Sequence, residues 1–402
     1  NPQIGDGRGV LFAQLRDARG RLLDLGTKGS GQTPWSRQGD GRLTLKGGVR
    51  EVLAAAMLEA LGVYTSKAFS LIETGEALHR GDEPSPTRSS VLIRLSHSHI
   101  RFGTFQRLAH LGDADAMGAL VEYCVRHLHP DADAGDLPAR AAGLFRASVD
   151  ATADLAASWM AAGFVHGVLN SDNMVVTGES FDYGPWRFLP ASDPNFVAAY
   201  FDQQGLYRFG RQPAAAAWNL AQLGSSLTLV CPVERLQPHM EAFEALYAQA
   251  FRRQCFALLG LSPGASAEED MADLQAFFGW MTSSGALWPQ VFFDWFGGAL
   301  SEARAMRGPL ANLYAQPAFA GVREGLMARA CVRPERLSHP YFAGEAPPLL
   351  LIEDVEAIWA PIAEADDWSA FEATLAHIER QRDALDLRPD ECPGREASLA
   401  AS

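Results

Sequence analysis

One stretch near the middle of this 402-residue chain constrains its fold more than any other. It reads His166-Gly-Val-Leu-Asn-Ser-Asp172-Asn173, and the triplet Asp182-Tyr-Gly begins nine residues after Asn173. Asn173 and Asp182 offer amide and carboxylate oxygens, the hard ligands that Mg²⁺ and Mn²⁺ prefer. The pattern therefore predicts that the fold brings two loop segments together around a divalent metal. Asp172 is the nearest carboxylate that could accept a proton there, although it could instead orient the loop as a turn residue.

The order of these residues resembles the metal-holding half of a protein-kinase site, where an Asn and the Asp of an Asp-Phe-Gly turn hold the metals that bridge nucleotide phosphates. A glycine-rich turn, Lys28 and Glu51 precede them in the kinase order. In kinases such a Lys contacts the phosphates and a helix Glu orients it through an ion pair. The kinase base would stand two residues after the His, where this chain has Val168. We therefore expect metal and nucleotide binding without ordinary kinase chemistry.

Hydrophobic periodicity predicts a strand-rich first part and a helix-rich remainder, hence an α+β fold of two lobes. The resemblance of the motifs to a kinase site implies that this fold is protein-kinase-like. We expect the N-lobe at residues 1–105 and the C-lobe at 106–402, with the catalytic and metal loops at 164–186. Strands are expected in a hairpin over 9–28 and at 67–72 and 91–95, with a helix over 49–61 that carries Glu51. Helices are expected at 114–129, 137–163, 213–229, 235–260 and 368–385.

Composition and charge limit the possible partners. Because 48% of the residues are hydrophobic, the chain can bury a substantial core. The formal net charge of −14 argues against bulk electrostatic binding to nucleic acid or to anionic membranes. No apolar run approaches the ~20 residues that a membrane helix needs. The five cysteines are scattered and lack metal-ligand spacing, which favours a reduced, cytoplasmic setting.

Two glycine turns, Gly5-Asp-Gly-Arg8 and Gly39-Asp-Gly-Arg42, are candidates for phosphate binding. Glycine backbones can approach phosphate oxygens closely and present N–H groups to them. Asp6 and Asp40 would repel a polyphosphate unless they bind metal or pair with an Arg, and Arg8 and Arg42 are the obvious local partners. Alternatively, both segments are simple tight turns capped by Asp.

Several further side chains permit either a functional or a structural interpretation. Arg94 and Arg101 suit phosphate because a guanidinium group binds two oxygens at once, but both reach one site only if the chain bends between them. They could instead be solvated arginines at a strand edge, and Lys28 and Glu51 could be ordinary surface charges. We expect His166 to pack and to hydrogen-bond the loop rather than to titrate.

Taken together, these motifs resemble the selenoprotein O family in order and spacing. The matching elements are Gly5-Asp-Gly-Arg8; Lys28-Gly-Ser-Gly; Gly39-Asp-Gly-Arg42; Arg50-Glu51; Arg94 to Arg101-Phe102-Gly103; His166-Gly167 through Asp172-Asn173-Met174; Asp182-Tyr-Gly-Pro185; Asp202 to Phe209; Gln212-Pro213; and Trp218-Asn219-Leu220. The likeness covers residues 4–225 and fades beyond them.

The resemblance implies a pseudokinase that binds ATP in a flipped orientation and transfers AMP to Ser, Thr or Tyr hydroxyls of other proteins. UMP transfer from UTP is also described for the family. It further implies roles for individual residues. Asp172 would be the catalytic proton acceptor, Glu51 would orient Lys28, and Asn173 and Asp182 would hold Mg²⁺ or Mn²⁺. The nucleotide would contact Gly5, Gly7, Arg8, Lys28, Asp40, Gly41, Arg94, Arg101 and Asp182.

The chain departs from the family pattern at both ends. Members usually carry a segment with aromatic and His residues just before the glycine turn, whereas this chain opens at Asn1, so a truncated N-lobe is expected. Some members end in a redox motif with Cys or selenocysteine. Here Cys392 has no second thiol nearby, so redox control by the tail is not expected, and a bacterial member without selenocysteine is expected. The alternative to an enzyme is a catalytically silent nucleotide-binding module.

Overall fold

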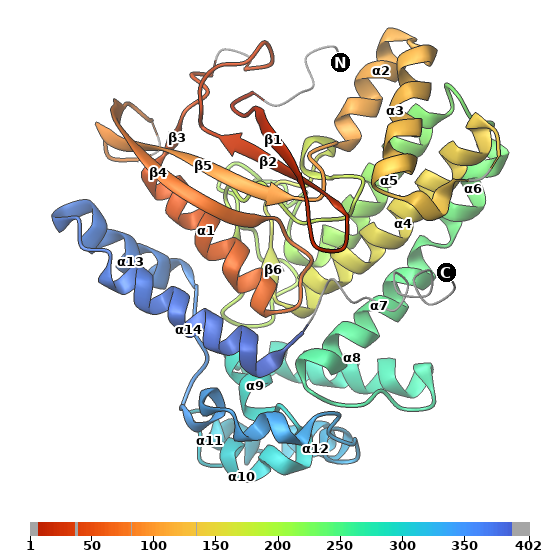
Figure 1. Ribbon diagram of the computed structural model, residues 1–402. Helices are drawn as coiled ribbons and strands as arrows, with labels where there is room; N and C mark the ends of the chain where they lie inside the picture. Colours follow the sequence, from red (N-terminus) through yellow and green to blue (C-terminus); the bar gives the residue numbers. More distant parts are fainter. Residues whose placement is uncertain (1–6, 37–38, 82, 134, 388–402) are drawn as a thin grey trace.

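The computed structural model describes residues 7–36, 39–81, 83–133 and 135–387 (Figure 1). It is a mixed α+β structure, in which a five-stranded antiparallel sheet is built from the first part of the chain. The strands follow the order β1-β2-β5-β3, and β4 also pairs with β5. Their bounds are β1 (Leu11–Arg16), β2 (Leu22–Lys28), β3 (Leu43–Thr44), β4 (Lys67–Leu78) and β5 (Thr87–Ser96).

The expected hairpin is present, and its turn is held by the Asp17 side chain. Asp17 accepts hydrogen bonds from the backbone N–H groups of Arg19 and Arg21 at 2.9 and 2.8 Å. Strands β4 and β5 extend beyond the expected 67–72 and 91–95. The added segments carry many polar or exposed residues, so hydrophobicity alone does not reveal them.

The pairing of β2 with β5 decides which side chains share a face of the sheet. Gly26 lies opposite Arg94, and Lys28 lies opposite Leu92. Because alternate residues of a strand point to the same side, Lys28 and Arg94 project from one face. That face is the one toward which Glu51 of the following helix reaches.

Helix α1 (Leu45–Ala60) begins four residues before the expected 49–61 segment. Thr44 explains the earlier start, since its hydroxyl accepts a hydrogen bond from the Gly47 N–H at 3.1 Å and caps the helix. The chain leaves the helix through Gly62, whose φ of +78° suits glycine. Both β4 and α14 pack against α1, so the helix lies between the sheet and the C-terminal part of the chain (Figure 1).

The remainder of the chain is mainly helical. The expected helix over 235–260 is two helices, α6 and α7, and Pro238 lies within the first of them. The expected boundary between residues 105 and 106 falls inside α2. The helices after α1 are α2 (Phe102–Leu111), α3 (Ala114–His127), α4 (Leu137–Ala161), α5 (Gln212–Leu227), α6 (Val233–Glu241), α7 (Phe243–Leu258), α8 (Ala267–Ser284), α9 (Trp288–Trp295), α10 (Glu302–Ala305), α11 (Ala311–Tyr314), α12 (Ala320–Met327), α13 (Ile352–Ala365) and α14 (Ser369–Leu385). Within the described ranges, none of these helices has the length and apolar character that crossing a bilayer requires.

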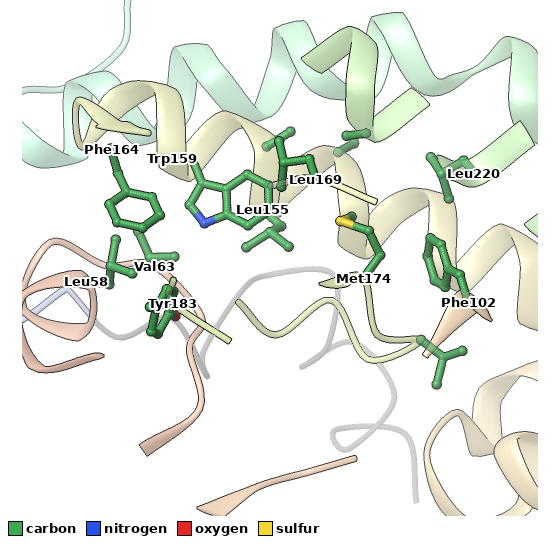
Figure 2. Close-up of a cluster of buried hydrophobic side chains, with 14 of the residues drawn as sticks. Leu58, Val63, Phe102, Leu155, Trp159, Phe164, Leu169, Met174, Tyr183 and Leu220 are labelled. Carbon is green, nitrogen blue, oxygen red and sulfur yellow. The ribbon is translucent and has the colours of Figure 1, made fainter. Parts of the chain in front are cut away.

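The segment between α4 and α5 is irregular but firmly anchored. It contains the short strands β6 (Phe164–Val165) and β7 (Arg187–Phe188), which pair with each other. Figure 2 shows how its apolar side chains enter the core beside Trp159 of α4. Leu169 and Met174 flank the polar run 170–173, and Tyr183 follows Asp182; all three are buried. Each such burial contributes about 1.5–3 kcal/mol, so the polar residues between these anchors are held in place.

Candidate active site

An open cleft with a cavity volume of about 780 Å³ lies where the sheet meets the glycine turns and the irregular segment. Among the described residues, six basic side chains and three carboxylates line it: Arg8, Lys28, Arg42, Arg80, Arg94 and Arg101, with Asp40, Asp172 and Asp182. This volume lies within the ~300–1,000 Å³ of typical small-molecule sites. Because the whole chain carries a net charge of −14, a cleft with an excess of basic groups indicates an anionic ligand.

A buried ion-pair network forms the inner end of this cleft. Lys28 pairs with Glu51 of α1 and with Asp182. Arg94 donates a hydrogen bond from Nη1 to Asp182 Oδ1 at 3.1 Å. The Lys28 and Glu51 side chains are only 2% and 3% exposed, so neither is a solvated surface charge. Burying charges is costly unless they are paired, and here the pairs connect β2, β5, α1 and the loop of Asp182.

Asp182 is the focus of this network. Its φ is +66°, a left-handed conformation that Asp tolerates better than most residues. Burial alone would raise its pKa, but the positive charges of Lys28, Arg94, Arg8 and Arg101 outweigh burial and hold the pKa well below the usual value. Asp182 is therefore ionised at neutral pH. Its contacts with Lys28 and Arg94 both use Oδ1.

Asn173 and Asp172 line the same cleft from a short 3₁₀ turn, Ser171–Asn173. The Asn170 side chain shapes this turn by accepting a hydrogen bond from the Asp172 N–H at 3.0 Å. Asn173 donates its side-chain N–H to the Val168 carbonyl at 2.9 Å, which directs the amide nitrogen to the backbone and leaves Oδ1 as its possible ligand atom. An amide oxygen and an ionised carboxylate are suitable ligands for Mg²⁺ or Mn²⁺.

This donor set fits a metal that is bound together with phosphates. No group of three or more His, Cys, Asp or Glu suited to a metal occurs within the described part of the chain. Mg²⁺ is usually bound by one or two carboxylates together with substrate phosphates rather than by an all-protein cage. Asn173 and Asp182 thus fit a metal that enters with its phosphate ligand.

Two amide side chains of α5 and one histidine hold the segment between α4 and α5 by hydrogen bonds to its backbone. Gln212 accepts from the His166 backbone N–H at 2.9 Å and donates to the Phe164 carbonyl at 2.7 Å. Asn219 donates to the Leu169 carbonyl at 2.8 Å. His166 donates from Nε2 to the Phe181 carbonyl at 3.0 Å, and burial lowers its pKa, so the ring is neutral at neutral pH. As expected, His166 packs and hydrogen-bonds the loop.

Helix α1 also holds the segment that follows Asp182. Arg50 donates to the Trp186 carbonyl at 3.0 Å, and its guanidinium carbon lies 4.7 Å from the centroid of the Trp186 ring. Burial lowers the pKa of Arg50 to about 10, which still leaves it charged at neutral pH. Two neighbouring residues of α1 therefore have separate roles: Glu51 positions Lys28, and Arg50 positions the chain just beyond Asp182.

At the outer end of the cleft, which Asp40, Arg42 and Arg80 line, one predicted pairing is wrong. The Asp40 side chain does not pair with the Arg42 side chain but with Arg80, through contacts of 2.8 and 3.1 Å. Arg42 donates only its backbone N–H to Asp40, at 2.9 Å, and its guanidinium pairs with Glu76 at 2.9 Å. Arg80 follows the long strand β4, and nothing local in the sequence connects it to Asp40.

The structure brings nearly all predicted site residues to one place. The cleft is lined by Gly7, Arg8, Lys28, Asp40, Gly41, Arg94, Arg101, Asp172, Asn173 and Asp182, while Glu51 contacts it through Lys28. Gly5 and Cys392 lie outside the described residues, so the predictions for them stay as made. Trp35, Arg80 and Asn170 also line the cleft but were not predicted. The sequence analysis names Gln212 and Asn219 only as parts of matching motifs and assigns them no role in the site. Their spacing of two helical turns indicates that both face the same loop.

The fold and the cleft define the class: an α+β protein with a basic site for an anionic ligand. The chain belongs to the family described as "Protein adenylyltransferase SelO", whose model matches residues 1–298. Three bacterial relatives carry the name "Protein nucleotidyltransferase YdiU". The one from Synechocystis is 54% identical over 263 residues, which are 65% of this chain and about half (55%) of that protein. The one from Gloeobacter violaceus is 43% identical over 387 residues, 94% of this chain and 79% of that protein. The one from Pseudomonas aeruginosa is 39% identical over 275 residues, 68% of this chain and 55% of that protein.

Proposed function

We propose that this chain is a metal-dependent protein adenylyltransferase, which transfers AMP from ATP to Ser, Thr or Tyr hydroxyls of protein substrates and releases pyrophosphate. One observation carries the proposal: Asp172, Asn173 and Asp182 share a cleft with six basic side chains, while the kinase base position holds Val168. The family membership and the names of the relatives support it.

The proposed reaction joins the substrate hydroxyl oxygen to the α-phosphorus of ATP. The bond between the α-phosphorus and the bridging oxygen breaks, and pyrophosphate leaves with the electron pair. The hydroxyl proton goes to a carboxylate, for which we propose Asp172. Asp182 and Asp40 are weaker bases than an ordinary carboxylate, because neighbouring cations and hydrogen bonds hold their pKa below the usual value despite the opposing effect of burial.

The leaving pyrophosphate carries several negative charges that the site must stabilise. We infer that Lys28, Arg8, Arg94 and Arg101 serve this purpose, because fixed cations placed where charge develops lower the barrier without reorganisation. Asn173 and Asp182 would hold Mg²⁺ or Mn²⁺, which when bound neutralises phosphate charge. The backbones of Gly5, Gly7 and Gly41, together with Asp40, would complete the nucleotide contacts.

The fold is part of the same proposal. A sheet that carries the Lys, a helix that carries its Glu partner, and a loop pair that carries Asn173 and Asp182 support a kinase-like fold of two lobes. We place the N-lobe at residues 1–105 and the C-lobe at 106–402.

The direct test uses ATP labelled in either its α- or its γ-phosphate. Label from the α-position should enter protein and label from the γ-position should not. Asp182→Ala should reduce incorporation by about a hundredfold or more, whereas Asp115→Ala, at an exposed acid of α3, should leave it unchanged.

Three other outcomes would contradict the proposal in different ways. Transfer of γ-label would indicate a conventional kinase. ATP binding without transfer of either label would indicate a silent nucleotide-binding module. Faster labelling from α-labelled UTP than from ATP would favour UMP transfer by the same site.

A further inference from the structure

Phe181 immediately precedes Asp182, and its ring is buried, with 2% of its surface exposed. The guanidinium carbon of Arg101 lies 5.1 Å from the ring centroid, and that of Arg94 lies 5.5 Å from it. Both arginines also line the cleft. One aromatic ring thus contacts two cations that face the same ligand space.

This arrangement solves a physical problem. Two guanidinium groups that face one space repel each other, so each contact that holds them there helps to shape the site. The face of an aromatic ring carries partial negative charge and attracts cations, most strongly where water is excluded. Asp182 also attracts both arginines, and it contacts Lys28 and Arg94 through one oxygen.

The ring itself is fixed in place. The Phe181 carbonyl accepts the hydrogen bond from His166 Nε2, which ties its backbone to the core beneath the loop. An aliphatic side chain could fill most of this space but would not attract a cation. The position therefore calls for an aromatic residue rather than merely an apolar one.

We propose that Phe181 is a positioning residue that holds Arg94 and Arg101 in the geometry that receives the phosphates of the nucleotide. The inference rests on the proposed function, in which these arginines bind phosphate. It extends that function to a side chain that no part of the motif pattern assigns and that acts only through the two arginines.

The test measures binding of inorganic pyrophosphate and of ATP to the full chain by titration calorimetry. Phe181→Leu should weaken both affinities by about tenfold, because two cation–π contacts are lost. Phe181→Tyr keeps the ring face and should stay within about threefold of the wild type. Phe319→Leu, at a fully buried ring in a separate apolar cluster, should lower the melting temperature without changing pyrophosphate affinity.

The proposal is overturned if Phe181→Leu binds pyrophosphate as tightly as the wild type, or if Phe181→Tyr loses as much affinity as Phe181→Leu. Should Phe181→Leu fail to fold, Phe181→Met offers the same aliphatic replacement with a more adaptable side chain. If the wild type binds neither pyrophosphate nor ATP, the proposed function fails together with this inference. If only the variants behave contrary to expectation, the inference alone fails.

Discussion

The two ends of the cleft use the same kinds of charged residue in different ways. At the inner end, Lys28 and Glu51 are 2% and 3% exposed, and their network connects four elements of the fold. At the outer end, Asp40 and Glu76 are 49% and 44% exposed, and within the described ranges Asp40 pairs with Arg80 and Glu76 with Arg42. The inner pairs are part of the core, whereas the outer pairs are surface contacts beside an opening.

This difference predicts different responses to a ligand. A buried charge that loses its partner is costly, so the inner network should keep its geometry whether or not a nucleotide is bound. An exposed ion pair is worth about 0–1 kcal/mol, so Arg80 and Arg42 can exchange their carboxylate partners for phosphate oxygens at little cost. The inner end is therefore preorganised, and the outer end can adapt.

The largest effect is expected from Lys28→Met, which leaves the buried Glu51 without its cation and removes one of the cations that contact Asp182. The free energy of unfolding should fall by about 3–5 kcal/mol, as measured by urea denaturation. Lys67→Met is the matched control, because Lys67 pairs with Glu59 of the same helix α1 but is 36% exposed; its cost should be below about 1 kcal/mol. Equal costs for the two variants would remove the distinction between buried and exposed pairs.

A smaller effect separates the two ends of the cleft through ligand binding. Arg94→Ala should weaken ATP binding by about ten- to a hundredfold, since a charged hydrogen bond in a buried setting contributes about 1.5–3 kcal/mol. Arg80→Ala should weaken it by less than about threefold, because an exposed pair contributes little. Calorimetric titration of both variants measures the difference. A larger loss for Arg80→Ala would place the main phosphate contacts at the outer end instead.

Local features of the sequence predicted much of this structure. The hairpin follows from its turn residues and α1 from the spacing of its apolar residues, and both signals lie within a few neighbouring positions. The loops of Asn173 and Asp182 follow from the order of the motifs. The cluster of Lys28, Asn173 and Asp182 was inferable because the motif order implies a known arrangement of loops around phosphates. Arg94 and Arg101 can reach one site only if the chain bends between them, and it does bend at His97, between β5 and α2.

Contacts between distant segments were not predictable in the same way. The pairing of Asp40 with Arg80 depends on where the long β4–β5 hairpin ends, and a sequence does not show that position. The contact of two arginines with Phe181 depends on strand register and on the helix start at Phe102. Similarly, the spacing of Gln212 and Asn219 places both on one face of α5, but the sequence does not show which backbone carbonyls they bind.

The central claim is that a metal and a nucleotide bind together at Asn173 and Asp182. It is tested most directly by titrating ATP into the wild type and into Asp182→Asn, each with and without Mg²⁺ or Mn²⁺. The wild type should bind ATP about tenfold or more tightly when the metal is present, and the variant should lose most of that gain. An equal gain in both proteins, or no gain in either, would contradict the account.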